Sequence, residues 1–279
     1  MSFAWNELTV RNDPKSNILL PKLRGTRKVP YINPMIILIH GYNVDEAEGR
    51  KSYFDMFTGL RKSGVPVNYR ENIYRFYWPG NTAIKLFSGA SYPWQISTAR
   101  KSAKLLGDFL IGAVNESSTT EFVFIAHSLG CRLLLEMISY INGVKPDFHN
   151  SISITVLMAA AVPVELISSN GQAWGSNTFN KIIASTKSKV LYSPFDKTLR
   201  WLFPIGQTAR LEGALPEAVG LHGQPRTAWT DSRDAQIDHG EYWKNVPVAE
   251  YVAESLGFAV RRTLPTYKIH KRALPVYRV

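Results

Sequence analysis

Unbroken apolar runs alternate along this chain with segments in which apolar residues recur every three or four positions. The unbroken runs predict strands buried on both faces, as in a parallel sheet, whereas the three-four spacing predicts helices with one buried face. Strands are predicted at 35–39, 73–78, 121–128, 151–157 and 189–192, with a weak last strand at 226–230, and helices at 53–60, 96–113, 131–141 and 247–260. This alternation predicts an α/β fold with a mainly parallel central sheet and helices on both faces.

The N-terminal residues 1–30 carry shorter β-like pieces at 7–10 and 17–20, broken by proline and glycine. They suit an N-terminal arm or edge strands. Residues 31–260 are predicted to form a single domain, because no repeat or linker divides them and no insertion is long enough for a large cap domain. Residues 261–279 form a basic C-terminal tail.

The net charge of +11 sits at the two ends of the chain. Residues 1–30 carry a net +4 and residues 261–279 carry a net +6, so the remainder is nearly neutral. We expect these ends to be solvated, with at most weak contact to an anionic surface, and we expect no specific nucleic-acid binding. A single cysteine excludes a disulfide framework. With no signal-peptide pattern and no membrane-length apolar run, we expect a cytoplasmic protein.

The stretch Ala126-His-Ser-Leu-Gly130 lies between a predicted strand and an apolar helix. A strand that ends on a serine flanked by small residues, with a helix starting at once, is typical of a nucleophile elbow. Small residues at 126 and 130 leave room for the strained turn. Ser128 is therefore the predicted nucleophile.

A serine nucleophile needs a base and an acid, and chain order favours His239 and Asp196. His239 follows the last predicted strand, and His222, in a Gly/Pro-rich loop, stays an alternative base. Asp196 follows the strand at 189–192, at the sheet edge where ligands meet open α/β sheets. Three other aspartates compete for the role of the acid; two of them fit a surface turn and the third is adjacent to His239. These three are Asp231, Asp234 and Asp238.

The oxyanion of an acyl-transfer intermediate needs hydrogen-bond donors. One is expected from the backbone N–H of Leu129, directly after the serine. The second is expected from Tyr42, in the turn His40-Gly-Tyr-Asn43 that follows the first buried strand. Gly41 lets that backbone turn, and Asn43 braces the loop or donates instead. His40 is expected to shape this turn, as His127 shapes the elbow.

With these motifs the chain resembles the serine hydrolases of the α/β-hydrolase superfamily. It is most similar to an uncharacterised bacterial group with His-Gly-Tyr-Asn after one strand, Trp-Pro after the next and Ala-His-Ser-Leu/Met-Gly at the elbow. Here these are residues 40–43, 78–79 and 126–130. The resemblance extends over residues 31–260 and includes Asp196, the stretch 210–213 and the aromatic pair at 242–243. It implies a single-domain α/β-hydrolase fold.

The predicted function is hydrolysis of a carboxylic ester through an acyl-enzyme on Ser128, with no cofactor and no metal. Apolar residues at 199–204 and in the loop 80–92 wall an acyl pocket, form a small lid, or simply pack on the closing helix. The substrate is expected to be a small ester or a lipid-like molecule. A lipase, phospholipase or thioesterase at an anionic interface stays an alternative, as does a non-catalytic binding module on the same fold.

Overall fold

The computed structural model describes residues 5–25, 34–81, 92–116, 121–167, 183, 187–208 and 216–260. Eight strands form one sheet in the order β2-β1-β4-β3-β5-β6-β7-β8. Neighbouring strands are parallel except for the antiparallel pair β1 and β2. The strands are β1 Asn6–Arg11, β2 Leu19–Gly25, β3 Met35–Ile39, β4 Ile73–Tyr77, β5 Phe122–His127, β6 Ile152–Met158, β7 Ser188–Tyr192 and β8 Asp231–Asp234. The predicted α/β fold with a mainly parallel sheet is confirmed.

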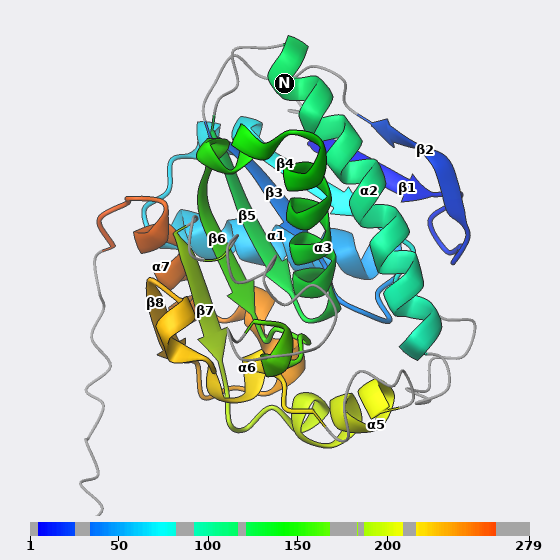
Figure 1. Cartoon of the computed structure of the whole chain (residues 1–279). Coiled ribbons are helices and arrows are strands. Elements are labelled where there is room, and N and C mark those ends of the chain that lie inside the picture. Colours follow the sequence, from blue (N-terminus) through cyan, green and yellow to red (C-terminus); the bar gives the residue numbers. More distant parts are fainter. Residues whose placement is uncertain are drawn as a thin grey trace, which may run out of the picture.

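Helices cover both faces of this sheet. Figure 1 shows α2 (Tyr92–Glu116) and α3 (Leu129–Val144) side by side on one face, and α1 (Glu46–Lys62) with α7 (Val246–Ser255) behind it. The central strands β3 and β5 are buried along their whole length, as their unbroken apolar sequences predict. Short helices α5 (Phe203–Thr208) and α6 (Val219–His222) lie at the edge where β5, β6 and β7 end.

Helix α1 starts at a polar cap that also fixes the loop before it. The Asp45 carboxylate accepts a hydrogen bond from the Glu48 backbone N–H at 2.9 Å, and the Glu48 side chain accepts one from the Asp45 N–H. This reciprocal capping box satisfies two amides that would otherwise lack partners. The loop from β3 to α1, which carries the predicted oxyanion turn, is thereby held where it enters α1.

The last strand differs from its predicted position. Residues Arg226–Ala228 form a 3-10 turn, and β8 follows at Asp231–Asp234. The apolar signal at 226–230 came from Trp229, whose buried indole donates its Nε1–H to the Gly223 carbonyl at 3.1 Å. A strand at the sheet edge needs only backbone pairing on one side, so β8 carries polar residues and gave no apolar pattern.

Two further boundaries differ from expectation. Helix α7 ends at Ser255 rather than near residue 260, and the apolar residues beyond it pack without being helical: the Phe258 ring meets the Tyr69 ring edge-on at 4.9 Å. Helix α2 begins at Tyr92, inside the expected loop, while positions 84, 86 and 87 of that loop lie outside the described residues.

At the N-terminus, β1 and β2 are strands of the central sheet, and Pro21 lies in β2, the outermost strand. This agrees with the rule that proline is tolerated at sheet edges. The predicted basic tail at 261–279 lies outside the described residues. None of the helices in the described ranges combines the length and hydropathy needed to cross a membrane.

Candidate active site

Ser128 lies at the sharp turn between β5 and α3. Its backbone has φ 55° and ψ −125°, a conformation that is strained for a residue with a side chain. The Ser128 N–H donates to the Met158 carbonyl of β6 at 2.9 Å, and the Ser128 carbonyl accepts from the Ala161 N–H at 3.2 Å. Backbone hydrogen bonds to the neighbouring strand therefore hold the strained turn, and Ser128 stands at the N-terminus of α3.

Two glycines allow the turn after β3 to approach this elbow. A Cβ on Gly130 would fall 2.9 Å from the Ile39 carbonyl oxygen and still closer to that of His40. A Cβ on Gly41 would fall 2.8 Å from the Cβ of Ser128. Both distances are shorter than real Cβ contacts, so neither position has room for a side chain. The oxyanion turn and the serine thus sit at backbone-to-backbone distance.

The structure brings Ser128, His239 and Asp196 together. His239 Nε2 is 2.8 Å from Ser128 Oγ, and His239 Nδ1 is 2.7 Å from Asp196 Oδ2. Asp196 is fully buried, and its other oxygen, Oδ1, accepts the Leu199 N–H at 2.8 Å. Since a carboxylate oxygen accepts, the Nδ1 of His239 carries the proton and its Nε2 lone pair faces the serine hydroxyl. This is the geometry of a serine, its base and the group that orients the base.

The loops that carry Asp196 and His239 are tied to each other by side-chain hydrogen bonds. Ser193, buried at the end of β7, accepts at its Oγ from the N–H of Phe195 at 3.2 Å and from that of Ile237 at 3.1 Å. Asp238 accepts at Oδ1 from the N–H of His239 at 2.9 Å, which lowers the pKa of Asp238, and from the N–H of Lys197 at 3.3 Å. The Ser193 and Asp238 hydrogen bonds therefore fix the distance between the loops that carry Asp196 and His239.

His127 connects the elbow to the His239 segment. Its Nε2–H donates to the His239 carbonyl at 2.9 Å, and its ring lies against the rings of Tyr242 and Trp243. Burial, with the nearby His239 as a further cause, holds the pKa of His127 well below the ordinary histidine value. His127 is therefore neutral and acts as a fixed donor, which extends the turn-shaping role predicted for it.

His40 is a buried, neutral element of the oxyanion turn. Its Nδ1–H donates to the Gly41 carbonyl at 2.9 Å, its ring stacks on Trp78, and its carbonyl accepts the Trp78 indole N–H at 2.8 Å. Burial, followed by the charge of Arg11, lowers the pKa of His40 from 6.5 to about 3. The predicted Trp-Pro motif of residues 78–79 thus packs directly against the predicted His-Gly-Tyr-Asn motif.

Arg11, at the end of β1, supports the same turn from below. Its side chain is buried, with one NH group bound to Asn81 Oδ1 at 2.7 Å and the other to the Val44 carbonyl, and it approaches His40 Nε2 at 3.5 Å. Burial lowers the pKa of Arg11 from its ordinary value to about 10, so the guanidinium is charged at neutral pH. A buried cation thus joins the loops after β3 and β4.

A cavity of about 210 Å³ opens over Ser128 and His239. Its lining includes Tyr42, Asn43 and Ala161, together with Thr198 and three apolar residues of the segment after Asp196. Asn43 has φ 57°, a left-handed conformation that asparagine tolerates, and its N–H donates to the Gly80 carbonyl at 2.7 Å. Leu129 is the first residue of α3, where backbone N–H groups have no acceptor within the helix. The two predicted oxyanion donors therefore flank the serine.

Three of the competing residues, His222, Asp231 and Asp234, lie elsewhere, while Asp238 bridges the two loops as described above. The His222 side chain is 44% exposed and lies 3.9 Å from Glu217. Asp231 and Asp234 are in β8 rather than in the surface turn expected for them, because β8 lies later than predicted. In the described part of the chain, no group of three or more His, Cys, Asp or Glu side chains could hold a metal ion.

Residues 28–243 match the sequence family described as "Alpha/beta hydrolase of unknown function (DUF900)". The chain belongs to this family. The match covers the elbow, the turn at residues 40–43, Asp196 and His239, whereas Arg11 lies before its first residue. No curated protein matches the sequence at a significant level.

Solved structures with a similar chain trace are distant. They include a gene product from Listeria innocua, with 12% identity and a TM-score of 0.43 over 82% of this hydrolase and 96% of that chain. An extracellular α/β-hydrolase from a Paenibacillus species has 14% identity and a TM-score of 0.39 over 81% and 99%. Carboxyl esterase 2 from Tuber melanosporum has 15% identity and a TM-score of 0.42 over 80% and 74%. Similarities this weak carry no argument about activity.

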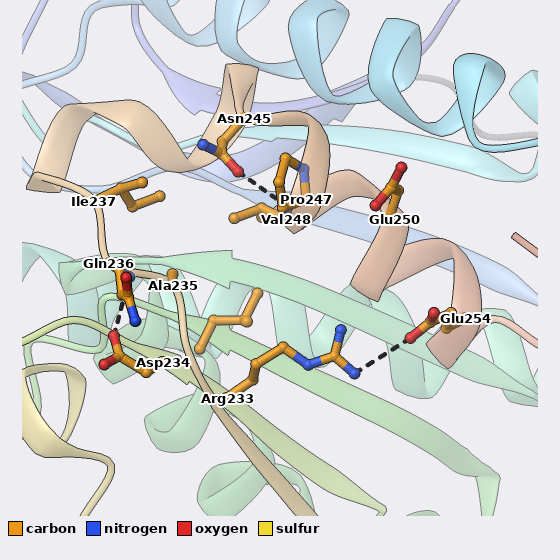
Figure 2. Close-up of a pocket in the computed structure, with 11 residues that line it drawn as sticks. Arg233, Asp234, Ala235, Gln236, Ile237, Asn245, Pro247, Val248, Glu250 and Glu254 are labelled. Atoms are coloured by element: carbon orange, nitrogen blue, oxygen red, sulfur yellow. Dashed lines mark hydrogen bonds and ion pairs between the residues drawn. The ribbon is translucent and has the colours of Figure 1, made fainter. Parts of the chain in front are cut away.

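A larger cavity, of about 380 Å³, lies on the other side of the His239 segment, between β8 and α7 (Figure 2). Figure 2 shows Arg233 paired with Glu254 at its floor, and Asn245 capping α7 through the Val248 N–H. Neither Ser128 nor His239 lines it. We therefore assign the candidate site of this hydrolase to the smaller cavity.

Sequence reasoning missed two residues that shape the site, Ser193 and Arg11. Ser193 stands in the loop that was identified through Asp196, three positions before it, so a search for loop-bridging hydroxyl groups next to the acid would have found it. Arg11 gave one signal, a charged residue at the end of an apolar strand. The stretch 210–213, part of the resemblance, lies outside the described residues of this hydrolase.

Proposed function

We propose that this protein is a serine hydrolase that cleaves carboxylic esters through an acyl-enzyme on Ser128. The observation that carries the proposal is the continuous hydrogen-bonded series from Ser128 Oγ through the His239 ring to Asp196, at the floor of a cavity. Three side chains from three separate loops meet in the order that activates a hydroxyl group.

In the first half of the reaction, Ser128 Oγ attacks the ester carbonyl carbon while its proton passes to His239 Nε2. The carbonyl oxygen becomes an oxyanion, which accepts from the N–H groups of Leu129 and Tyr42. The imidazolium form of His239 is stabilised by the buried Asp196 carboxylate. His239 then gives its proton to the leaving alkoxide, the C–O bond breaks, and an alcohol departs.

In the second half, a water molecule replaces the alcohol. His239 takes a proton from this water, the hydroxide oxygen attacks the acyl carbon, and a second tetrahedral oxyanion forms in the same place. Its collapse breaks the bond to Ser128 Oγ, which recovers its proton from His239, and a carboxylic acid leaves. Each oxyanion donor is expected to contribute about 10²–10³-fold in rate.

The apolar wall of the cavity favours an ester with an acyl chain over a highly polar substrate. Leu199, Leu202 and Phe203 line the cavity together with Tyr42. Their side chains have no charge that would bind a polar acyl group, and they keep bulk water away from the acyl-enzyme.

A fluorophosphonate probe tests this proposal. The folded protein should be labelled on Ser128 and should hydrolyse p-nitrophenyl esters, and the labelling should disappear in Ser128→Ala and after unfolding in urea. His239→Ala should slow labelling by orders of magnitude, because the hydroxyl loses its base. Folded protein that neither reacts with the probe nor hydrolyses any ester in a chain-length series would exclude the enzyme and favour a binding module.

A further inference from the structure

The segment 195–205, which contains Asp196 and runs into the start of α5, has two apolar sides. One side faces the cavity over Ser128, through Leu199, Leu202 and Phe203. The other side faces solvent: Phe195 is 63% exposed, Trp201 66% and Ile205 57%. Burial of the inner side explains why the segment folds onto the site, but it does not explain the large apolar side chains on the outside.

Other exposed apolar residues in the described ranges are scattered. Ile18 lies in the loop before β2, and Phe54, Val67, Val144 and Val246 each lie on a different helix. Single exposed apolar residues are normal on any soluble surface, whereas a group next to a functional cavity marks an interaction surface. Phe195, Trp201 and Ile205 are instead all exposed within the single segment 195–205, other residues of which line the cavity, and we call these three residues the outer apolar face.

The charges around the outer apolar face are mostly positive. Lys197 and Arg200 are exposed within the segment, whereas the Asp196 carboxylate is buried and bound to His239. The neighbouring exposed carboxylate, Asp238, is engaged by two backbone N–H groups. Tryptophan with lysine and arginine is the combination that stabilises proteins at the boundary of an anionic lipid surface.

We propose that the outer apolar face docks this protein onto an anionic lipid surface, from which the ester enters the cavity over Ser128. The choice of a lipid surface rather than a protein follows from charge, because the exposed Lys197 and Arg200 beside Trp201 complement anionic headgroups. The statement about the ester rests on the proposed function, and the docking itself does not.

The test uses the full chain with intact Ser128 and vesicles of a diether phosphatidylglycerol, whose ether linkages resist hydrolysis. Binding is measured by flotation in 0.5 M NaCl, where the charges of the terminal segments are screened. The double variant Phe195→Ser/Trp201→Ser is compared with Phe54→Ser/Val67→Ser, which removes two apolar residues of similar exposure from other elements. Fluorophosphonate labelling and unfolding curves report whether each variant is folded.

We expect the Phe195→Ser/Trp201→Ser variant to bind vesicles at least about 10-fold more weakly than wild type, while the Phe54→Ser/Val67→Ser variant binds like wild type. At low salt, Lys197→Gln/Arg200→Gln should lose most of the preference for phosphatidylglycerol over phosphatidylcholine vesicles. The proposal is overturned if wild type does not float, if both apolar variants bind equally well, or if the outer apolar face instead holds a dimer in solution. Failure of labelling with intact vesicle binding would reject the esterase and keep the docking surface.

Discussion

The two sides of the candidate site are held in place by different interactions. On the serine side, Ser128 and the oxyanion turn are fixed by backbone hydrogen bonds and by the close approach of Gly41 and Gly130. On the acid–base side, Asp196 and His239 come from loops joined through side chains, chiefly Ser193 and Asp238.

This difference predicts that substitutions on the two sides will affect stability and activity in different proportions. A side chain added on the serine side meets main-chain atoms that cannot move without disturbing β3 and β5, so it should reduce stability and activity together. A polar group removed on the acid–base side leaves the sheet intact, so it should reduce activity far more than stability. Variants of matched chemistry can test whether the two sides respond in these ways.

The largest effect is expected on the acid–base side, from Asp196→Asn. The amide keeps the Leu199 hydrogen bond but presents the wrong partner to His239 Nδ1, so the imidazole loses its orientation and its stabilised cation. We expect kcat for a p-nitrophenyl ester to fall about 10⁴-fold with little change in the urea unfolding midpoint. Asp238→Asn, in the neighbouring exposed carboxylate, should cost less than about 10-fold. A larger loss for Asp238→Asn would mean that the acid has been misassigned.

On the serine side, Gly130→Ala should lower the free energy of unfolding by about 3 kcal/mol, because the new methyl group meets the carbonyl oxygens of Ile39 and His40. Activity should fall with it, since the elbow must shift away from the oxyanion turn. Gly143→Ala, in the same helix with open space around it, is the matched control and should be neutral or stabilising. Urea unfolding and ester hydrolysis measure both quantities. Equal effects of the two substitutions would remove the steric argument.

A smaller effect on the serine side concerns pH. The pKa of His40 is about 3 in the folded state and about 6.5 when unfolded, so only the unfolded chain gains a proton as the pH falls below 6.5. Stability is therefore full above pH 6.5 and is lost toward pH 3. Between pH 7.5 and pH 5.0 this one group should cost about 2 kcal/mol.

The matched variant is His40→Gln, whose side-chain oxygen can replace the Nε2 acceptor without titrating. Its unfolding free energy should change less between pH 7.5 and pH 5.0 than that of wild type, by about the same 2 kcal/mol. Carboxylates common to both proteins cancel in this comparison. An unchanged pH dependence would show that His40 is not the source.

The features that could be predicted from the sequence are those encoded by residues close together in the chain. The elbow is encoded within ten consecutive residues, so the strand, the turn and Ser128 could be identified together. Chain order then selected Asp196 and His239, and the structure places His239 within hydrogen-bond distance of both Asp196 and Ser128. Their catalytic roles stay predictions.

Features that depend on distant parts of the chain were not predictable in this way. Ser193 reaches Ile237 across 44 positions, and Arg11 reaches Asn81 across 70, so no local pattern records either contact. Strand β8 was misplaced for a related reason, since its pairing with β7 is made by backbone atoms and leaves no mark on the side-chain pattern.

Arg11 has a consequence for where the working unit of this protein begins. The family match starts at residue 28, yet the guanidinium that braces the oxyanion turn comes from β1, which also pairs with β4. Cutting the chain at the start of the matched region would remove both β1 and β2, expose the edge of β4 and remove the buried Arg11 cation from the turn it supports. The shortest fragment that keeps the geometry of this site is therefore longer than residues 28–243. It must include β1 and β2, because Arg11 and the pairing of β1 with β4 support the turn after β3.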